Sequence, residues 1–259
     1  MEKALATIVI PLRLPEPSAL EKVSLDQTIA VLRRYPITFM APTGLDTAWY
    51  EDYCRGKIAA SVERFSWQGF EEFTKLLLSA TFYERFLDYE YMLVCHLDAF
   101  VFRDEVEQWC RAGYDYVGAV IYNPEWIFQP SLLRTVTGFT PREYFGNGGF
   151  ALKKISSFYH VTSTFQWYIN FNFWVRNVRG QGLLEDIFLT QHFPRLSAKF
   201  KIPPKAVAQK FGAAYEIWKQ EDLPFTNEDN RNLPFGTHGW IQHHQDFWRP
   251  CIRRCGYAI

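Results

Sequence analysis

The chain has 259 residues, and 28 Lys and Arg balance 28 Asp and Glu, so the formal net charge at pH 7 is zero. This balance excludes binding of nucleic acid or of an anionic membrane through a global basic field. Hydrophobic residues make up 48% and aromatic residues 18% of the chain, which excludes intrinsic disorder. No run approaches the ~18 apolar residues of a membrane span, and the N-terminus lacks the apolar stretch of a signal peptide. We therefore expect a cytoplasmic protein.

The first 120 residues alternate between expected strands and helices. Short β-branched or apolar runs predict strands at residues 7–10, 37–40, 91–95 and 116–120. Patterns typical of helices lie between them, at residues 70–78 and 106–112 and after two apparent capping boxes, Ser24 with Gln27 and Thr81 with Glu84. This order implies parallel strand pairs with right-handed crossovers. We predict an α/β fold, one Rossmann-like domain over residues 1–259 with a mostly parallel central sheet flanked by helices.

Beyond residue 120 the alternation is less regular. A loop rich in proline and aromatic residues spans 123–130, and a tail rich in Pro and Asn ends the chain. An aromatic helix is expected near residues 165–178. It carries more rings than one helix face buries, so part of it could form a subunit contact or a membrane contact.

His96-Leu97-Asp98 directly follows the predicted strand at 91–95. In open parallel sheets, ligands bind beyond the carboxyl ends of the strands. Asp98 is therefore placed to hold a divalent cation that bridges a diphosphate. The alternative is that Asp98 caps the element that follows the strand.

Gly146-Asn147-Gly148-Gly149 carries three glycines in four positions. The segment either makes a tight turn, which is the commoner case, or lets a ligand approach the backbone closely. It matches neither a Walker loop nor the dinucleotide fingerprint.

Glu185-Asp186 stands at the start of an expected helix, just after Gly180-Gln181-Gly182. One of these carboxylates could act as a base that deprotonates a hydroxyl group. The alternative is that both complement the positive end of the helix dipole.

Three of the six histidines lie close together near the end of the chain, at His238, His243 and His244. His238, beside a glycine, could complete a metal site begun by Asp98, or could be a hydrogen-bonded loop residue. His243 and His244 are adjacent and would point in different directions, so we expect both to belong to the scaffold.

Taken in order, these segments resemble a bacterial and fungal domain of formerly unknown function that is placed among the GT-A glycosyltransferases. The resemblance covers most of the chain. It is carried by Ile8-Val9-Ile10-Pro11, residues 91–102, residues 114–119, Gly146 to Leu152, Glu185-Asp186-Ile187-Phe188, Ala214-Tyr215-Glu216 and residues 235–240.

The resemblance implies a donor site for a nucleotide-diphosphate sugar. In such enzymes an Asp-x-Asp motif binds the metal and the nucleotide, and His96 here stands in place of the first aspartate. The resemblance therefore implies Asp98 and His238 as ligands of a divalent cation, Mn²⁺ or Mg²⁺. Pro11, His96, Asp98 and Gly118 are the implied donor-binding residues.

The resemblance also implies an acceptor site. Gly146, Asn147, Gly148, Gly149 and Trp240 are the residues implied there. Glu185 and Asp186 correspond to the acidic pair of these enzymes, and the second member, Asp186, is the expected base. In-line attack with that base would invert the anomeric centre.

The implied function is transfer of a sugar from a nucleotide-sugar donor to an acceptor hydroxyl in surface polysaccharide or glycan synthesis. Residues of about 1–120 would bind the donor, and residues of about 121–259 would bind the acceptor and form the tail. The expected partners are the donor and a glycan or lipid-linked acceptor, with no nucleic acid, and with peripheral contact at the inner face of a membrane.

Two other interpretations remain open. The first is a catalytically inactive nucleotide-binding or sugar-binding module of the same fold. The second is a metal-dependent hydrolase built on His96, Asp98 and His238, although such a site normally has more closely paired ligands.

Overall fold

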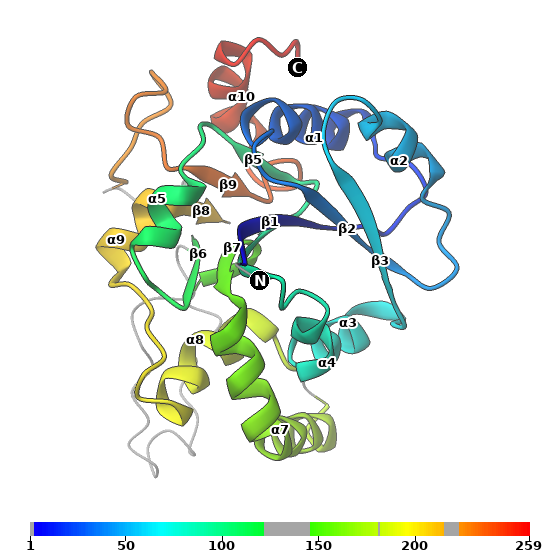
Figure 1. Ribbon diagram of the computed structural model, residues 1–259. Coiled ribbons are helices and arrows are strands. Elements are labelled where there is room, and N and C mark those ends of the chain that lie inside the picture. Colours follow the sequence, from blue (N-terminus) through cyan, green and yellow to red (C-terminus); the bar gives the residue numbers. More distant parts are fainter. Residues whose placement is uncertain (1–2, 122–145, 181, 215–222) are drawn as a thin grey trace.

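A nine-stranded mixed sheet forms the centre of the computed structural model, which describes residues 3–121, 146–180, 182–214 and 223–259 (Figure 1). The strand order is β3-β2-β1-β4-β7-β6-β8-β9-β5. The bounds are β1 (Ala4–Pro11), β2 (Ile37–Pro42), β3 (Ala60–Phe65), β4 (Tyr89–Cys95), β5 (Ala99–Val101), β6 (Tyr116–Ile121), β7 (Gly146–Lys154), β8 (Gly212–Ala214) and β9 (Gly236–His238).

Most neighbouring strands are parallel. The neighbours β3, β2, β1 and β4 are parallel to one another, and so are β6, β8 and β9. Strand β7 is antiparallel to its neighbours β4 and β6, and β5 is antiparallel to β9. The predicted α/β class with a mostly parallel central sheet is therefore confirmed.

Helices cover both faces of the sheet. Their bounds are α1 (Ala19–Val31), α2 (Ala48–Cys54), α3 (Gly69–Leu77), α4 (Ala80–Glu84), α5 (Val106–Arg111), α7 (Ile155–Val178), α8 (Glu185–Leu196), α9 (Lys205–Phe211) and α10 (Gln245–Arg254). One apolar cluster joins α1, α2 and α5 to the sheet, and a second joins α3, α4, α7 and α8 to the opposite face. None of the helices in the described ranges is long and apolar enough to cross a membrane.

The central strands contribute to both apolar clusters. In β1, Ile8 and Ile10 lie in the first cluster and Val9 in the second. Successive side chains of a strand point to opposite faces, so a strand covered on both sides needs an unbroken apolar run. This is why short apolar runs without alternation located β1, β2, β4 and β6 correctly.

The predicted helix starts were wrong in two places. The capping box of α1 is formed by Ser18 and Glu21, whose side chains each bond the backbone N–H of the other residue. Ser24 lies inside this helix. The N-cap of α4 is Ser79, whose Oγ accepts from the backbone N–H of Phe82 at 3.3 Å, so Thr81 is not the cap. A capping-box pattern can occur one or two turns inside a helix as well as at its start.

The interpretation of Gly146 to Gly149 as a turn was also wrong, because these residues form the first part of β7. The structure contains several elements that the sequence patterns missed. Three of them, β5, β8 and β9, are only three residues long, and β3 is a partly exposed edge strand. The expected loop at 123–130 lies outside the described residues.

The chain adds strands on one side of β1 first and then on the other, so the strand order changes direction between β1 and β4. From β1 the chain passes outward to β2 and β3, then returns to place β4 on the other side of β1, parallel to it. Such a switch point opens a crevice beyond the carboxyl ends of the two strands. Here those ends are Pro11 and Cys95.

Trp240 anchors the segment after β9 to α1. The side chain is fully buried, its Nε1 donates to Ser24 Oγ at 2.9 Å, and its ring packs edge-to-face on Phe100 at 6.3 Å. We expect Trp240→Ala to lower the free energy of unfolding by about 3–5 kcal/mol, because it leaves a large cavity. Ser24→Ala removes only the hydrogen bond and should cost about 1–3 kcal/mol. Urea denaturation measures both; equal effects would contradict this assignment.

Candidate active site

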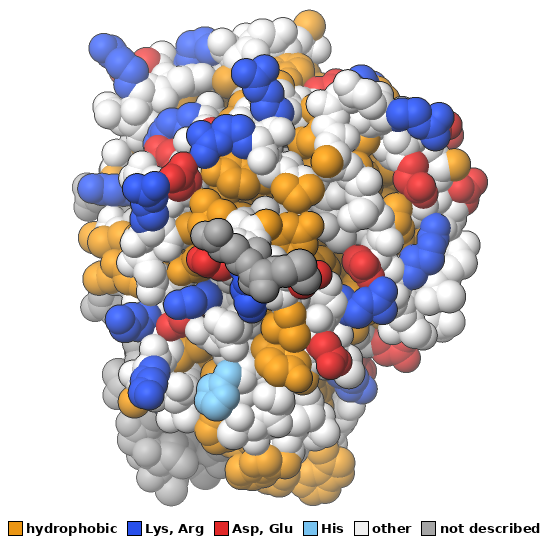
Figure 2. Space-filling model, viewed as in Figure 1, with side chains coloured by type: hydrophobic (Ala, Val, Ile, Leu, Met, Phe, Trp, Pro, Cys, Tyr) orange, Lys and Arg blue, Asp and Glu red, His pale blue; other side chains and the backbone are white. Residues whose placement is uncertain are grey.

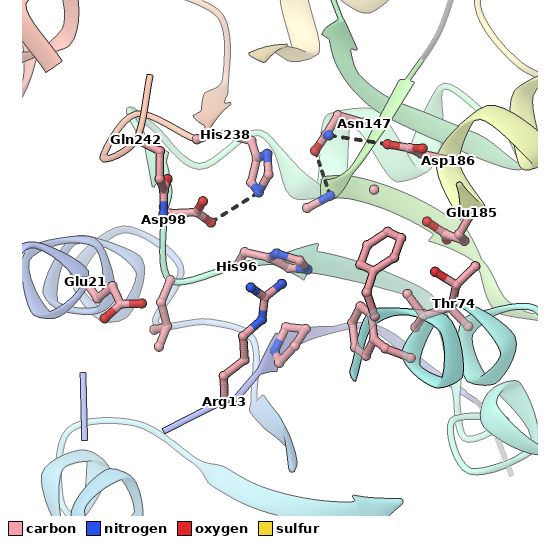
Figure 3. Close-up of a pocket in the computed structure, with 18 of the residues that line it drawn as sticks. Arg13, Glu21, Thr74, His96, Asp98, Asn147, Glu185, Asp186, His238 and Gln242 are labelled. Atoms are coloured by element: carbon pink, nitrogen blue, oxygen red, sulfur yellow. Dashed lines mark hydrogen bonds and ion pairs between the residues drawn. The ribbon is translucent and has the colours of Figure 1, made fainter. Parts of the chain in front are cut away.

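A pocket of about 610 Å³ opens at the switch point. It is lined by residues that follow β1 and β4, by the start of β7, by the end of β9 and the loop after it, and by the facing sides of α3 and α8. Ligand pockets of enzymes commonly fall in this size range. Figure 3 shows His96, Asp98 and His238 on one side of the pocket, with Glu185 and Asp186 on the other.

Three potential ligand atoms from His96, Asp98 and His238 lie within 4.8 Å of one another. Asp98 Oδ1 is 3.2 Å from His238 Nε2, and the two imidazole rings are 5.2 Å apart. His96 and Asp98 flank the short turn between β4 and β5, and His238 ends β9, whose partner is β5. Strand pairing thus joins residues that lie far apart in the sequence.

The protonation states of His96 and Asp98 suit a cation. Burial, reinforced by the nearby His238, lowers the pKa of His96 to about 3, so its imidazole is neutral at pH 7. Burial by itself would raise the pKa of Asp98, but the charge and hydrogen bond of His238 outweigh it and hold that pKa below its usual value. Neutral imidazole and ionised carboxylate are the forms that bind metals.

His96 Nε2 is buried and has no hydrogen-bond partner among the described residues. A buried polar atom without a partner is costly, and a metal ion is one way to satisfy it. The donor set of two imidazoles and one carboxylate is common in transition-metal sites. The residues present therefore fit a divalent cation.

Two glycines of β7 make room for the site. A Cβ atom on Gly149 would lie 2.1 Å from His238 Nε2, and one on Gly148 would lie 2.5 Å from Glu185 Oε2. The backbone oxygen of Gly149 also accepts from the N–H of His96 at 2.8 Å. The glycines are therefore explained by close approach of side chains rather than by a turn.

Glu185 and Asp186 begin α8, but their surroundings differ. Lys153 of β7 is fully buried, and its Nζ lies 2.5 Å from Glu185 Oε1. A buried ion pair of this kind fixes the start of the helix. Glu185 is therefore committed to a structural contact.

Asp186 faces the pocket with weaker contacts. Its Oδ1 accepts from the N–H of Ile187 at 2.8 Å, and Asn147 Nδ2 lies 3.4 Å from its Oδ2. Burial, together with the charge of Glu185, raises its pKa to about 6. A carboxyl group with such a pKa can accept a proton near neutral pH.

The sequence patterns missed Arg13, which also lines the pocket (Figure 3). It stands two residues after the end of β1, at the switch point, and this position is the only signal that could have found it. In the described lining, Arg13 is the one Lys or Arg, against five carboxylates: Glu16, Glu21, Asp98, Glu185 and Asp186. With Glu185 offset by Lys153, the pocket is still acidic.

The structure brings together most of the residues singled out in the sequence. The described pocket lining contains Pro11, His96, Asp98, Asn147, Gly148, Gly149, Glu185, Asp186 and His238. It also contains His243, which had been assigned to the scaffold.

Gly118, Gly146 and Trp240 are not part of the described lining. Gly118 lies inside β6 at a register shift, and Gly146 pairs with that strand. Trp240 was expected to bind the acceptor, but its complete burial leaves no surface for a ligand. Its aromatic ring is used to pack the core instead.

Comparison with protein families gives one match. The model of the family described as "Protein of unknown function (DUF5672)" matches residues 59–238. The chain belongs to the DUF5672 family. The matched segment contains every member of the His96, Asp98 and His238 group and both carboxylates of α8. Comparison with curated proteins gives no match.

Two solved glycosyltransferase structures are similar to this DUF5672 chain. Mouse xyloside xylosyltransferase 1, in its apo form, has a TM-score of 0.51 and 9% identity over 92% of this chain and 97% of that one. Core-mannan synthase A (CmsA/Ktr4) from Aspergillus fumigatus, in its Mn/GDP form, has a TM-score of 0.42 and 12% identity over 60% of this chain. The match spans 61% of the length of that synthase. The xylosyltransferase likeness shows that the fold is similar to that of glycosyltransferases.

We expect Glu185→Gln to destabilise the DUF5672 chain, because it leaves the buried ammonium of Lys153 without a counter-charge. The free energy of unfolding should fall by about 3–5 kcal/mol. Glu16→Gln, a change at an exposed carboxylate of the same pocket, should alter it by less than about 0.5 kcal/mol. Urea denaturation of both variants at pH 7 measures the difference. Wild-type stability of Glu185→Gln would show that the ion pair is dispensable.

Proposed function

We propose that the protein is a glycosyltransferase that moves a sugar from a nucleotide-diphosphate donor to an acceptor hydroxyl. The observation that carries the proposal is that one pocket holds both a His-Asp-His group that fits a cation and a carboxyl group whose pKa is raised to about 6. The pocket lies at the switch point of a sheet whose fold is similar to that of glycosyltransferases. Shared fold alone does not imply activity, so the proposal rests on these residues.

The charge of the pocket supports a cation-dependent donor site. A bound diphosphate would lie near the carboxylates of the pocket lining. The single positive charge of Arg13 cannot balance the negative charge of these carboxylates and the diphosphate. We assign His96, Asp98 and His238 as the ligands of a divalent cation. When bound, the cation would offset the negative charge that develops on the departing diphosphate. Because two ligands are imidazoles, the set favours Mn²⁺ or another transition metal over Mg²⁺.

Arg13 and Pro11 complete the proposed donor site on the β1 side. The guanidinium has five N–H donors in a planar fork that matches phosphate oxygens. Its place just after β1, with the guanidinium beside His96 in Figure 3, suits a contact with the donor diphosphate. Since His238 comes from the late part of the chain, the donor site draws on both of the expected halves, 1–120 and 121–259.

Asp186 is the proposed base. Its carboxylate takes the proton of the acceptor hydroxyl as that oxygen bonds to the anomeric carbon, and the bond from this carbon to the diphosphate oxygen breaks. The bonding electrons leave with the nucleotide diphosphate. Attack from the side opposite the leaving group inverts the anomeric centre. We place the acceptor beside Asn147 and Gly148, which lie between Asp186 and the cation group.

The first test is a screen of nucleotide sugars with Mn²⁺, following thermal shift and release of nucleotide diphosphate. One donor should stabilise the wild type and be hydrolysed slowly. Asp98→Ala should lose donor binding, whereas Asp186→Asn should keep it and lose turnover by about 10²–10⁴-fold. Binding without turnover in the wild type would favour the inactive binding module. A screen in which no donor shifts the melting temperature contradicts the proposal.

The pKa of Asp186 predicts opposite effects of pH on activity and on stability. Turnover should rise with pH through about 6, because the base must be ionised. The pKa of Asp186 in the folded state is raised above its ordinary value of 3.8, so between pH 3.8 and about 6 the folded state binds more protons than the unfolded state. The stabilising contribution of this proton is therefore lost as pH rises through about 6. Asp186→Asn should therefore be inactive yet melt at a higher temperature than the wild type at pH 7. A lower melting temperature would contradict the assignment.

Gly149→Ala should displace His238, because the added Cβ would lie 2.1 Å from Nε2. We expect affinity for Mn²⁺, measured by isothermal titration calorimetry, to fall by at least about tenfold, as expected when one of three ligands is disturbed. Gly182→Ala is the matched control, because no atom lies within 4 Å of its Cβ position. Equal affinity in both variants would exclude His238 as a ligand.

A further inference from the structure

Large exposed hydrophobic side chains are confined to two neighbouring places. Among the described residues there are six: Leu14, Phe70, Trp167, Phe171, Trp174 and Val178. The last four lie on α7, and the first two line the pocket. Scattered exposed apolar residues are normal on a protein surface, whereas a cluster marks a contact.

The four residues of α7 form one stripe, called here the α7 face. Their spacing of four, three and four positions places them on the same side of the helix. Trp167 is 68% exposed, Phe171 55%, Trp174 62% and Val178 69%. Hydrophobic side chains gather over the lower end of α7 in Figure 2.

The α7 face is free of charged residues as far as residue 175. From residue 163 to residue 175 the sequence has no Asp, Glu, Lys or Arg, and the other exposed positions there are Ser, Thr and Asn. Arg176 and Arg179 follow at the C-terminal end. The nearest acidic side chain of α3, Glu71, is paired with Lys75 at 2.8 Å. The patch is thus apolar with a basic end.

One helix separates the α7 face from the pocket. Asn177 Nδ2 donates to Glu71 Oε1 of α3 at 3.0 Å, and Lys75 of α3 lies over the ring of Phe173. The other side of α3 lines the pocket through Phe70, Phe73, Thr74 and Leu77. The exposed ring of Phe70 therefore lies on the helix that connects the α7 face to the pocket rim.

The size of the α7 face argues against a second copy of the chain. Large aromatic side chains bury about 150–250 Å² each, so three that are little more than half exposed offer roughly 400 Å². A stable protein interface needs about 800 Å² from each partner. A lipid surface has no such minimum, because one helix face sinks to the level of the headgroups. Tryptophan prefers this level of a bilayer, and arginine there meets anionic headgroups.

We propose that the α7 face binds the surface of a lipid bilayer and brings the rim of the pocket, with Phe70 and Leu14, close to the headgroups. If the proposed function holds, on which this step rests, the acceptor is a hydroxyl group carried by a membrane lipid or by a lipid-linked glycan. The apolar residues at the rim would then lie along the path of its lipid part.

The test is co-sedimentation of the full chain with vesicles of phosphatidylcholine mixed with phosphatidylglycerol. The test variant combines Trp167→Ser, Phe171→Ser and Trp174→Ser, all at exposed positions. The control is Trp49→Ser on α2, whose residues pack on the opposite face of the sheet. We expect the wild type and the control to partition onto vesicles within about twofold of each other, and the triple variant at least about tenfold more weakly, since it loses most of the apolar contact.

Three results would overturn the inference: wild-type protein that stays in the supernatant, a triple variant that pellets like the wild type, or a wild-type dimer that the triple variant abolishes in sedimentation velocity without vesicles. Thermal shift with a donor keeps this separate from the proposed function. The triple variant should respond to the donor as the wild type does. Vesicle binding by a chain that consumes no donor would support the α7 face while contradicting the transferase.

Discussion

The close approach of side chains to the backbone of β7 is the constraint on which the site depends. This strand runs antiparallel between β4 and β6, and its first residues separate the cation group from the carboxylates of α8. Gly149 leaves the space that His238 occupies, and Gly148 leaves the space for Glu185. Asn147, the residue before these glycines, accepts a hydrogen bond through Oδ1 from the N–H of Gly149 at 2.8 Å. Its Nδ2 lies 3.4 Å from Asp186 Oδ2. One strand therefore sets the position of both reactive groups.

The adjacent carboxyl groups of Glu185 and Asp186 have different surroundings. Lys153 holds the first as an ion pair, and burial beside that charge raises the pKa of the second to about 6. On the opposite wall His238 acts in the other direction and keeps Asp98 ionised. The pocket thus places a carboxyl group of raised pKa opposite a carboxylate that stays ionised.

Features set by neighbouring residues in the chain could be predicted from the sequence. The apolar runs located β1 and β4, and the positions of His96, Asp98 and the start of α8 were predicted from the ends of the expected strand and helix. Lys153, Arg13 and Trp240 could not be assigned, because their roles depend on partners distant in the chain. A lysine near the end of a strand is usually exposed, and only the fold shows that Glu185 covers it. Likewise, the glycines of β7 suggest a turn until the side chains that approach them are known.

The pairing of β5 with β9 has a consequence for how the chain folds during its synthesis. Ala99 lies opposite His238, so the short strand next to Asp98 acquires its partner only from the last strand of the sheet. The contacts among β1, β2 and β4 need only the first part of the chain, whereas this pairing closes a very long loop and belongs to the slow, non-local class. During synthesis, which proceeds from the N-terminus, the strands around Pro11 can pair well before His238 has been translated. The complete group of His96, Asp98 and His238 then marks a completed fold, because no partly folded chain lacking β9 contains all three residues.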